Sequence, residues 1–277
     1  TAVEMPKGFI PGRIYELVYT AENPRVAGLG MAAVRDFISY LKYGGDGLSV
    51  FGDQRRYIKR ALAYGNSQSG RWLRTFLYHG QNEDEKGRKV FDGVWAHVAG
   101  AGRGGFNHRF AQPGRSGGAH VNTLYPIDLF PFSDVPQPNP ETGEVESLLM
   151  RVRPAVMPLI VYTNTSSEYW HRCASLIHTS PDGALDAPLP PQTRLYFISA
   201  AQHGTAPEPR RDPAFRHPTN PNEFRPLQRA LLVALHEWVR DGKAPPASVY
   251  PLIAEQQLVP AARIRFPAIP GASLPRF

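Results

Sequence analysis

Short runs rich in β-branched and aromatic residues alternate along the chain with longer stretches in which apolar residues recur every three or four positions. The short runs indicate strands and the longer stretches indicate amphipathic helices. The expected strands are residues 13–19, 56–65, 90–100, 158–163 and 194–200, with a weak last strand at 249–254, and the expected helices are residues 31–42, 71–80, 169–178 and 226–242. Strands that alternate with helices predict an α/β fold, in which a mainly parallel sheet has helices on both faces.

The length and the spacing of these elements indicate one domain. A chain of 277 residues with 42% hydrophobic residues can bury the core of a single large α/β domain. No linker divides it, so we expect residues 1–277 to form one domain. Residues 101–153 show little periodicity, and loops of this length often form lids or binding insertions. We therefore expect a lid-like insertion there.

The formal net charge of +7 raises the question of an anionic partner. The densest basic group, Arg55, Arg56, Lys59 and Arg60, flanks an expected strand and belongs to no nucleic-acid-binding motif. We interpret it as a solvated basic face and expect no nucleic-acid partner. No apolar stretch approaches the roughly 20 residues of a membrane span. The single cysteine, Cys173, excludes an intramolecular disulfide.

The sequence YGNSQSGR at residues 64–71 fits a nucleophile elbow, a tight turn from a strand into a helix with a serine at its tip. Such a turn needs small residues two positions before and after the serine, and Ser67 has Gly65 and Ser69 there. Ser69 is the weaker nucleophile candidate, because its own flanking positions are Ser67 and the bulky Arg71. A simpler interpretation is that Ser67 only caps the following helix.

Two residues further along the chain stand where the partners of an elbow serine belong. In the α/β-hydrolase fold the acid and the histidine follow the serine in that order, each after a later strand. Glu168 follows the expected strand 158–163, and His203 follows the expected strand 194–200. Taken alone, Glu168 could serve only the dipole of the next helix and His203 could be a surface residue. Asp134, Asp182 and Asp186 compete with Glu168 for the acid's role.

Other motifs suggest cofactors but lack the required context. Gly100, Gly102 and Gly105 match a dinucleotide fingerprint without a convincing helix behind them, and Gly28, Gly30 and Ala33 match its variant at a distance from any strand. His97, His108 and His120 have no metal-binding spacing. We therefore expect no nucleotide, no metal and no other cofactor.

Three stretches carry a resemblance to a known family. The sequences GNSQSGRWLRTFLYHGQNEDEKGRKVFDGVWAHVAGAGRGGFNHRF, TNTSSEYWHRCASLIHTSPDG and RLYFISAAQHG resemble a little-characterised group of bacterial α/β-hydrolase-domain proteins. The resemblance covers nearly the whole chain and implies the α/β-hydrolase fold with the triad Ser67, Glu168 and His203.

A more distant similarity is to the glucuronoyl esterases, through the glycine-rich turn AHVAGAGRGG. Some of those enzymes carry the catalytic acid in this turn. This chain has no acid there, which favours Glu168. The similarity itself implies that carbohydrate esters are candidate substrates.

These observations predict a serine esterase that cleaves a small-molecule or carbohydrate ester through an acyl-enzyme. The backbone amide of Gln68 should donate to the oxyanion. Arg71, Arg103 and Arg109 are candidates for binding an acidic substrate group, and Trp170 is a candidate pocket wall. The rival hypotheses are a non-catalytic binding protein on a hydrolase scaffold and a nucleotide-dependent enzyme.

The position of the elbow also predicts that the chain is an internal piece of a longer hydrolase. In this fold the nucleophile ends the fifth strand, and the loop that supplies the second oxyanion amide follows the third. Only one strand and helix, residues 13–42, precede the strand that ends at Ser67. We expect the N-terminal strands, and with them part of the oxyanion hole, to lie outside residues 1–277.

Overall fold

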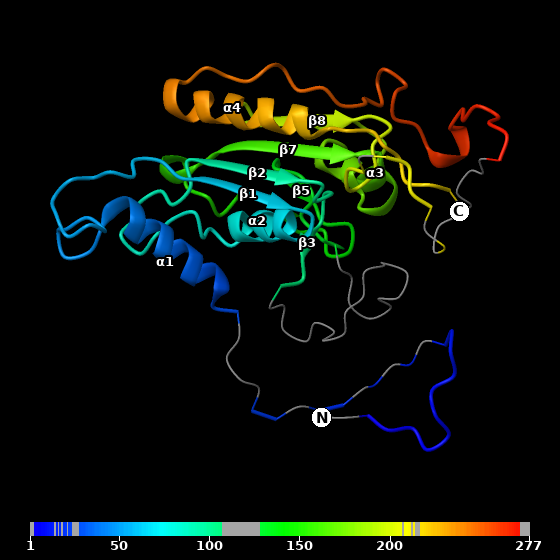
Figure 1. Ribbon diagram of the computed structural model, residues 1–277, viewed down its shortest axis with the longest axis horizontal. Helices are drawn as coiled ribbons and strands as arrows, with labels where there is room; N and C mark the ends of the chain where they lie inside the picture. Colours follow the sequence, from blue (N-terminus) through cyan, green and yellow to red (C-terminus); the bar gives the residue numbers. More distant parts are fainter. Residues whose placement is uncertain are drawn as a thin grey trace.

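The centre of the molecule is a parallel sheet of four strands, as a computed structural model shows (Figure 1). The structure describes residues 3–13, 15, 17, 19–20, 22–23, 28–106, 128–206, 208–211, 213 and 217–271. The strand order is β1 (Leu62–Asn66), β2 (Gly93–His97), β7 (Leu159–Thr165) and β8 (Thr193–Ile198), and every neighbouring pair is parallel. All four carboxyl ends therefore lie at one edge of the sheet.

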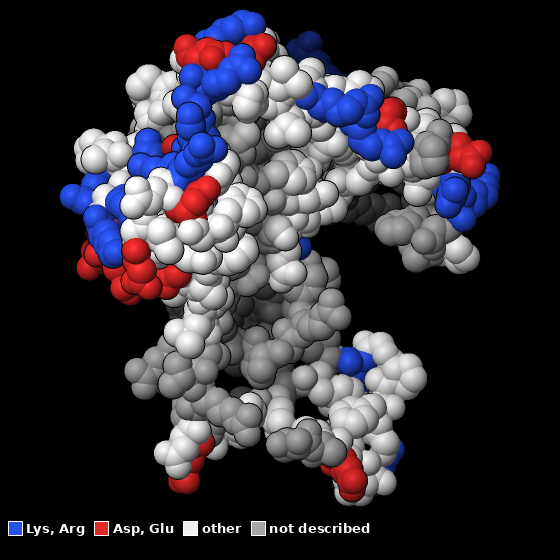
Figure 2. Space-filling view, turned by 60° about the vertical axis from the view of Figure 1, so that its left-hand side comes forward, with Lys and Arg blue, Asp and Glu red and all other residues white. Residues whose placement is uncertain are grey.

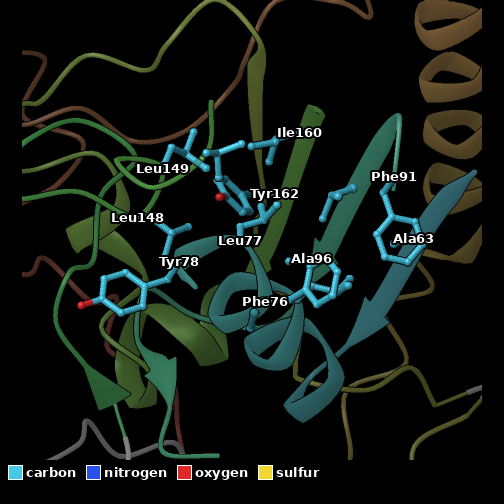
Figure 3. Packing of buried hydrophobic residues seen from close by; sticks show 14 of the residues in the cluster. Ala63, Phe76, Leu77, Tyr78, Phe91, Ala96, Leu148, Leu149, Ile160 and Tyr162 are labelled. Carbon is cyan, nitrogen blue, oxygen red and sulfur yellow. The ribbon is translucent and has the colours of Figure 1, made fainter. Parts of the chain in front are cut away.

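Helices cover both faces of this sheet, as the hydrophobic pattern predicts (Figure 1). Successive strand residues point to opposite faces. On one face, residues such as Ala96 and Tyr162 pack with Phe76 and Leu77 of helix α2 (Gln68–Tyr78) (Figure 3). On the other face, Trp95 and its neighbours pack against helix α4 (Arg225–Asp241). The described residues also form helices α1 (Gly30–Tyr43) and α3 (Ser166–His171).

The segment that begins at Asp128 adds to the body of the molecule. Two short antiparallel pairs form, β3 (Arg103–Gly104) with β4 (Asp128–Leu129), and β5 (Gln137–Pro138) with β6 (Val145–Glu146). Leu148 and Leu149 are buried in the core on the α2 side (Figure 3). The described residues 128–153 of the expected lid-like insertion thus pack on the domain, and residues 107–127 of that insertion lie outside the described part.

The expected strand at residues 13–19 is wrong for the residues that the structure describes. Arg13, Tyr15, Leu17 and Tyr19 belong to no strand. Leu17 is 60% exposed and Tyr19 is 63% exposed. Residues 14, 16 and 18 lie outside the described part. A strand needs a neighbour for its backbone groups, and β-propensity alone does not supply one.

Other boundaries also differ from those expected, and the expected strand 90–100 is limited to β2. The expected strand 56–65 is limited to β1, and the expected helix 71–80 begins earlier, at Gln68. The expected helix 169–178 is divided into α3 and a 3₁₀ helix (Ala174–Ile177), because Cys173 between them has a left-handed backbone with φ of 43°. The weak strand 249–254 is reduced to one parallel bridge between Val249 and Tyr196. Pro251 has no N–H with which to extend that bridge.

Charged groups are mixed over the surface of the described residues. Figure 2 shows several groups of Lys and Arg side chains on one face, with Asp or Glu side chains among them. No helix in the described part is long and apolar enough to cross a membrane.

Candidate active site

Ser67 alone connects the end of β1 to the start of α2. Its backbone has φ of 57° and ψ of −117°, a region that costs free energy for any residue with a side chain. Two hydrogen bonds hold the turn: the Ser67 amide donates to the His97 carbonyl at 2.8 Å, and the Ser67 carbonyl accepts from the Arg71 amide at 3.0 Å. The sharp strand-to-helix turn expected from the sequence is therefore present.

Glycines allow the close approach of backbone segments around this turn. A Cβ atom at Gly65 would lie 2.5 Å from the Ser69 carbonyl oxygen, so the small residue expected at position 65 is required. On the helix side Gly70 is also closely surrounded, because a Cβ atom there would lie 3.0 Å from both the Ala99 Cβ and the Gly65 carbonyl oxygen. Sequence reasoning assigned this role to Ser69 and missed Gly70, although a glycine inside a helix is a recognised signal of close packing.

The side chains of Ser67, His203 and Glu168 form one continuous line of hydrogen bonds. The distance from His203 Nε2 to Ser67 Oγ is 2.8 Å, and the distance from His203 Nδ1 to Glu168 Oε1 is 2.6 Å. The Glu168 side chain is 1% exposed and the His203 side chain is 51% exposed. Of the three residues that the sequence selected, His203 thus lies within hydrogen-bonding distance of both Ser67 and Glu168, at the carboxyl edge of the sheet.

Glu168 has a second partner in addition to His203. Its Oε2 accepts hydrogen bonds from the Thr165 amide at 2.8 Å and from the Thr165 hydroxyl at 2.6 Å. Thr165 is the N-cap of α3, so Glu168 completes a capping box. Glu168 therefore stabilises the start of helix α3, as the simpler interpretation expected, and it also contacts His203.

These contacts keep Glu168 ionised. Burial by itself would raise the pKa of Glu168, but the hydrogen bonds from His203 and Thr165 outweigh it, and the net pKa lies below the ordinary value. An ionised carboxylate accepts the Nδ1 proton of His203. The Nε2 atom of the same ring is then free to accept the Ser67 hydroxyl proton.

The three competing acids lie elsewhere and have other partners. Asp134 is buried and accepts hydrogen bonds from the Tyr162 hydroxyl and the Thr193 hydroxyl, both at 2.8 Å. Asp182 bonds to the Ser180 hydroxyl in an exposed turn. Asp186 accepts from the amides of Ile253 and Ala254, both at 2.9 Å. Each carboxylate fixes local structure.

His97 supports the turn at Ser67 through a backbone hydrogen bond, a role that sequence reasoning did not identify. Its carbonyl holds the Ser67 amide, and its ring nitrogen Nδ1 lies 2.7 Å from the Thr163 hydroxyl. Burial lowers the pKa of His97 to about 4. The ring is therefore neutral at neutral pH, although Glu168 and His203 are close enough to influence it electrostatically. In the sequence this position was only a histidine within the expected strand 90–100.

The amide of Gln68, the expected oxyanion donor, is the first of helix α2. The first amides of a helix have no intrahelical acceptor and lie at the positive end of the helix dipole. This amide can therefore donate to a developing negative charge beside Ser67. A second donor outside residues 1–277 stays a prediction.

The substrate-binding candidates have different surroundings. Arg103 is held in place, because its guanidinium donates to the Phe130 carbonyl and stacks 3.6 Å from the centre of the Tyr78 ring. Arg71 lies 3.8 Å from an oxygen of Asp128. Trp170 is 40% exposed and follows Glu168 by two positions. Arg109 lies outside the described residues.

In the glycine-rich sequence at residues 100–105, atoms of the protein lie close beside two of the glycines. A Cβ atom at Gly102 would meet Asp128 at 2.3 Å, and one at Gly104 would meet Phe106 at 2.1 Å. Side chains of the protein therefore occupy this space. The turn leads into strand β3 instead of a helix N-terminus. No group of three or more His, Cys, Asp or Glu residues in the described part could hold a metal ion.

A parallel sheet with helices on both faces, and a serine on a strained turn between strand and helix, define the class of α/β hydrolases. The family described as alpha/beta hydrolase domain matches residues 1–263, and the chain belongs to it. No curated protein and no solved structure matches the chain. Membership supports hydrolase activity in general.

Proposed function

We propose that the protein is a serine hydrolase that cleaves carboxylic esters with Ser67, His203 and Glu168 as its catalytic triad. The observation that carries this proposal is the hydrogen-bonded line from Ser67 through His203 to the buried Glu168. Small-molecule esters or carbohydrate esters are the proposed substrates.

In the proposed reaction His203 Nε2 takes the proton of Ser67 Oγ while this oxygen attacks the ester carbonyl carbon. The resulting oxyanion is stabilised by the amide of Gln68. His203 then gives the proton to the leaving alkoxide, and the acyl group stays on Ser67. A water molecule, deprotonated by His203, attacks the acyl-enzyme and restores the free serine. Glu168 stabilises the imidazolium in both steps.

The test uses a fluorophosphonate probe together with a panel of acyl and alkyl esters that includes uronate esters. We expect the wild-type protein to be labelled at Ser67 and to hydrolyse at least one member of the panel. Ser67→Ala should lose the labelling, and its kcat should fall by about 10³- to 10⁶-fold, as in other serine triads. Ser69→Ala is the matched control, because it removes a hydroxyl two positions away.

Circular dichroism and thermal unfolding would verify that both variants fold. A Ser67→Ala protein with near-normal rates would contradict the proposal. A folded wild-type protein that neither reacts with the probe nor hydrolyses any ester would favour the alternative of a non-catalytic binding protein.

A further inference from the structure

Arg71 lies one helical turn behind the proposed nucleophile. It is four residues after Ser67 in α2, which corresponds to a rise of about 6 Å along the helix. Long side chains on a helix lean toward its N-terminus and cover the residue four positions earlier. Arg71 therefore belongs to the face of α2 that carries Ser67.

The guanidinium of Arg71 has hydrogen-bond donors that the described protein does not use. Its ion pair with Asp128 has a distance of 3.8 Å, too long for a hydrogen bond, and no other described residue accepts from it. The Arg71 side chain is only 14% exposed. Burial and the nearby charge of Arg172 lower the pKa of Arg71. A bound oxyanion would offset both the lost solvation of Arg71 and its repulsion by Arg172.

Asp128 interacts with a second arginine as well as with Arg71. Arg172 donates to its other oxygen at 3.4 Å, so two guanidinium groups share one carboxylate. Arg172 is four residues after Glu168, and its amide bonds to the Glu168 carbonyl. Arg71 thus lies about one helical turn after the proposed nucleophile, and Arg172 lies about one turn after the proposed acid.

Resting on the proposed function, we propose that Arg71 binds a carboxylate carried by the ester substrate, and that the enzyme is selective for anionic esters. Arginine suits this role because its planar N–H groups match two carboxylate oxygens. Arg103 donates from Nε and Nη2 to the Phe130 carbonyl and stacks on the Tyr78 ring, so we do not include it in this subsite.

The experiment compares matched pairs of esters that differ in charge. Mono(4-nitrophenyl) succinate against 4-nitrophenyl butyrate tests a carboxylate on the acyl side, and 4-acetoxybenzoate against 4-acetoxybenzamide tests one on the alcohol side. We expect kcat/KM to favour the anionic member of one pair. In Arg71→Gln this preference should fall by about 10- to 100-fold, the usual contribution of a charge-assisted hydrogen-bonded pair.

Two variants act as controls for charge and geometry. Arg240→Gln removes the same charge at an exposed position near the end of α4, where Arg240 pairs with Asp241, and should keep the preference. Arg71→Lys keeps the positive charge but lacks the planar guanidinium, and it should retain part of the preference for the anionic ester. Thermal unfolding of each variant separates misfolding from lost recognition.

Equal kcat/KM within both pairs, or a preference that survives Arg71→Gln, would overturn this inference and leave the proposed function intact. If neither hydrolysis nor fluorophosphonate labelling occurs, the proposed function fails, and calorimetry decides the Arg71 subsite separately. Ser67→Ala should bind monomethyl succinate more tightly than dimethyl succinate. The double variant Ser67→Ala/Arg71→Gln should lose this difference, and a difference that it retains would also overturn the inference.

Discussion

The two carboxylate oxygens of Glu168 have separate partners, His203 on one side and the Thr165 cap on the other. A glutamine would keep the shape of this side chain. Its NH2 group, however, would face a ring nitrogen that must itself donate. Histidine would then favour the tautomer whose Nε2 carries a proton, and this nitrogen could not accept from Ser67.

We expect Glu168→Gln to lower kcat by about 10⁴-fold through this tautomer change. The measurement is steady-state ester hydrolysis, with the melting temperature as a check on folding. Glu83→Gln is the matched control, since Glu83 is a surface residue paired with Arg153, and its rate should equal that of the wild type. A Glu168→Gln enzyme within tenfold of wild type would remove Glu168 from the proposed mechanism.

At the scale of single residues, the sequence identified candidates that follow the ends of successive strands in the order serine, acid, histidine. Ser67, Glu168 and His203 could be chosen because the carboxyl ends of parallel strands meet at one edge of the sheet. Asp128 and His97 could not be assigned in the same way. Their partners Arg71, Arg172 and Thr163 belong to other elements, and the distances between elements are not encoded in local patterns.

Helix α2 can begin immediately after Ser67 because Gly70 lets its first turn approach the end of β2. Glycine inside a helix ordinarily costs about 1 kcal/mol relative to alanine. Here alanine would place its Cβ 3.0 Å from the Cβ of Ala99 and 3.2 Å from the His97 carbonyl oxygen. The helix would have to move away from the strand end that supports Ser67.

We therefore expect Gly70→Ala to lower the free energy of unfolding by about 1 to 3 kcal/mol, as overpacking does, and to reduce kcat as the serine moves. Urea denaturation and hydrolysis rates would measure both effects. Gly30→Ala is the control, because nothing lies within 4 Å of its added Cβ at the start of α1. A Gly70→Ala protein as stable and as active as Gly30→Ala would show that the close approach is not needed.

At the scale of elements, helices and buried strands agreed with the pattern better than exposed strands did. Strand β2 is buried at every position and lies within the strand expected at residues 90–100. Residues 13–19 have equally strong β-propensity, yet their described members lie outside the sheet. β-propensity describes how well a side chain fits a pleated, half-buried surface. Whether a segment lies on such a surface depends on its tertiary contacts.

The whole molecule should lose stability in mild acid, because two histidines that are fully buried in the described part stay neutral in the folded state. Burial lowers the pKa of both His97 and His178 to about 4, against an ordinary value of 6.5. As pH falls below 6.5, the unfolded chain takes up protons that the folded protein does not. The free energy of unfolding is therefore greatest above pH 6.5 and declines toward pH 4, by about 3 kcal/mol for each histidine.

His178→Gln tests this dependence away from the site, since His178 contacts the Tyr169 hydroxyl and the Tyr250 ring. Urea denaturation at pH 7 and pH 5 should show that the variant loses about 2 kcal/mol less than wild type between the two values. His236→Gln, on the exposed side of α4, should behave like wild type. An unchanged pH dependence in His178→Gln would contradict the assignment.

The hydrogen-bonded pair Ser67 and His203 is separated by 136 positions along the chain. During synthesis from the N-terminus, the elbow exists before the histidine loop has been made. In a complete chain, bringing Ser67 and His203 together is also slow, because the chain loses conformational entropy before the contacts between these distant segments form. Reactivity toward a fluorophosphonate should therefore return late in refolding, after the helical signal. For this protein, the time at which the serine becomes nucleophilic would mark the completion of the fold.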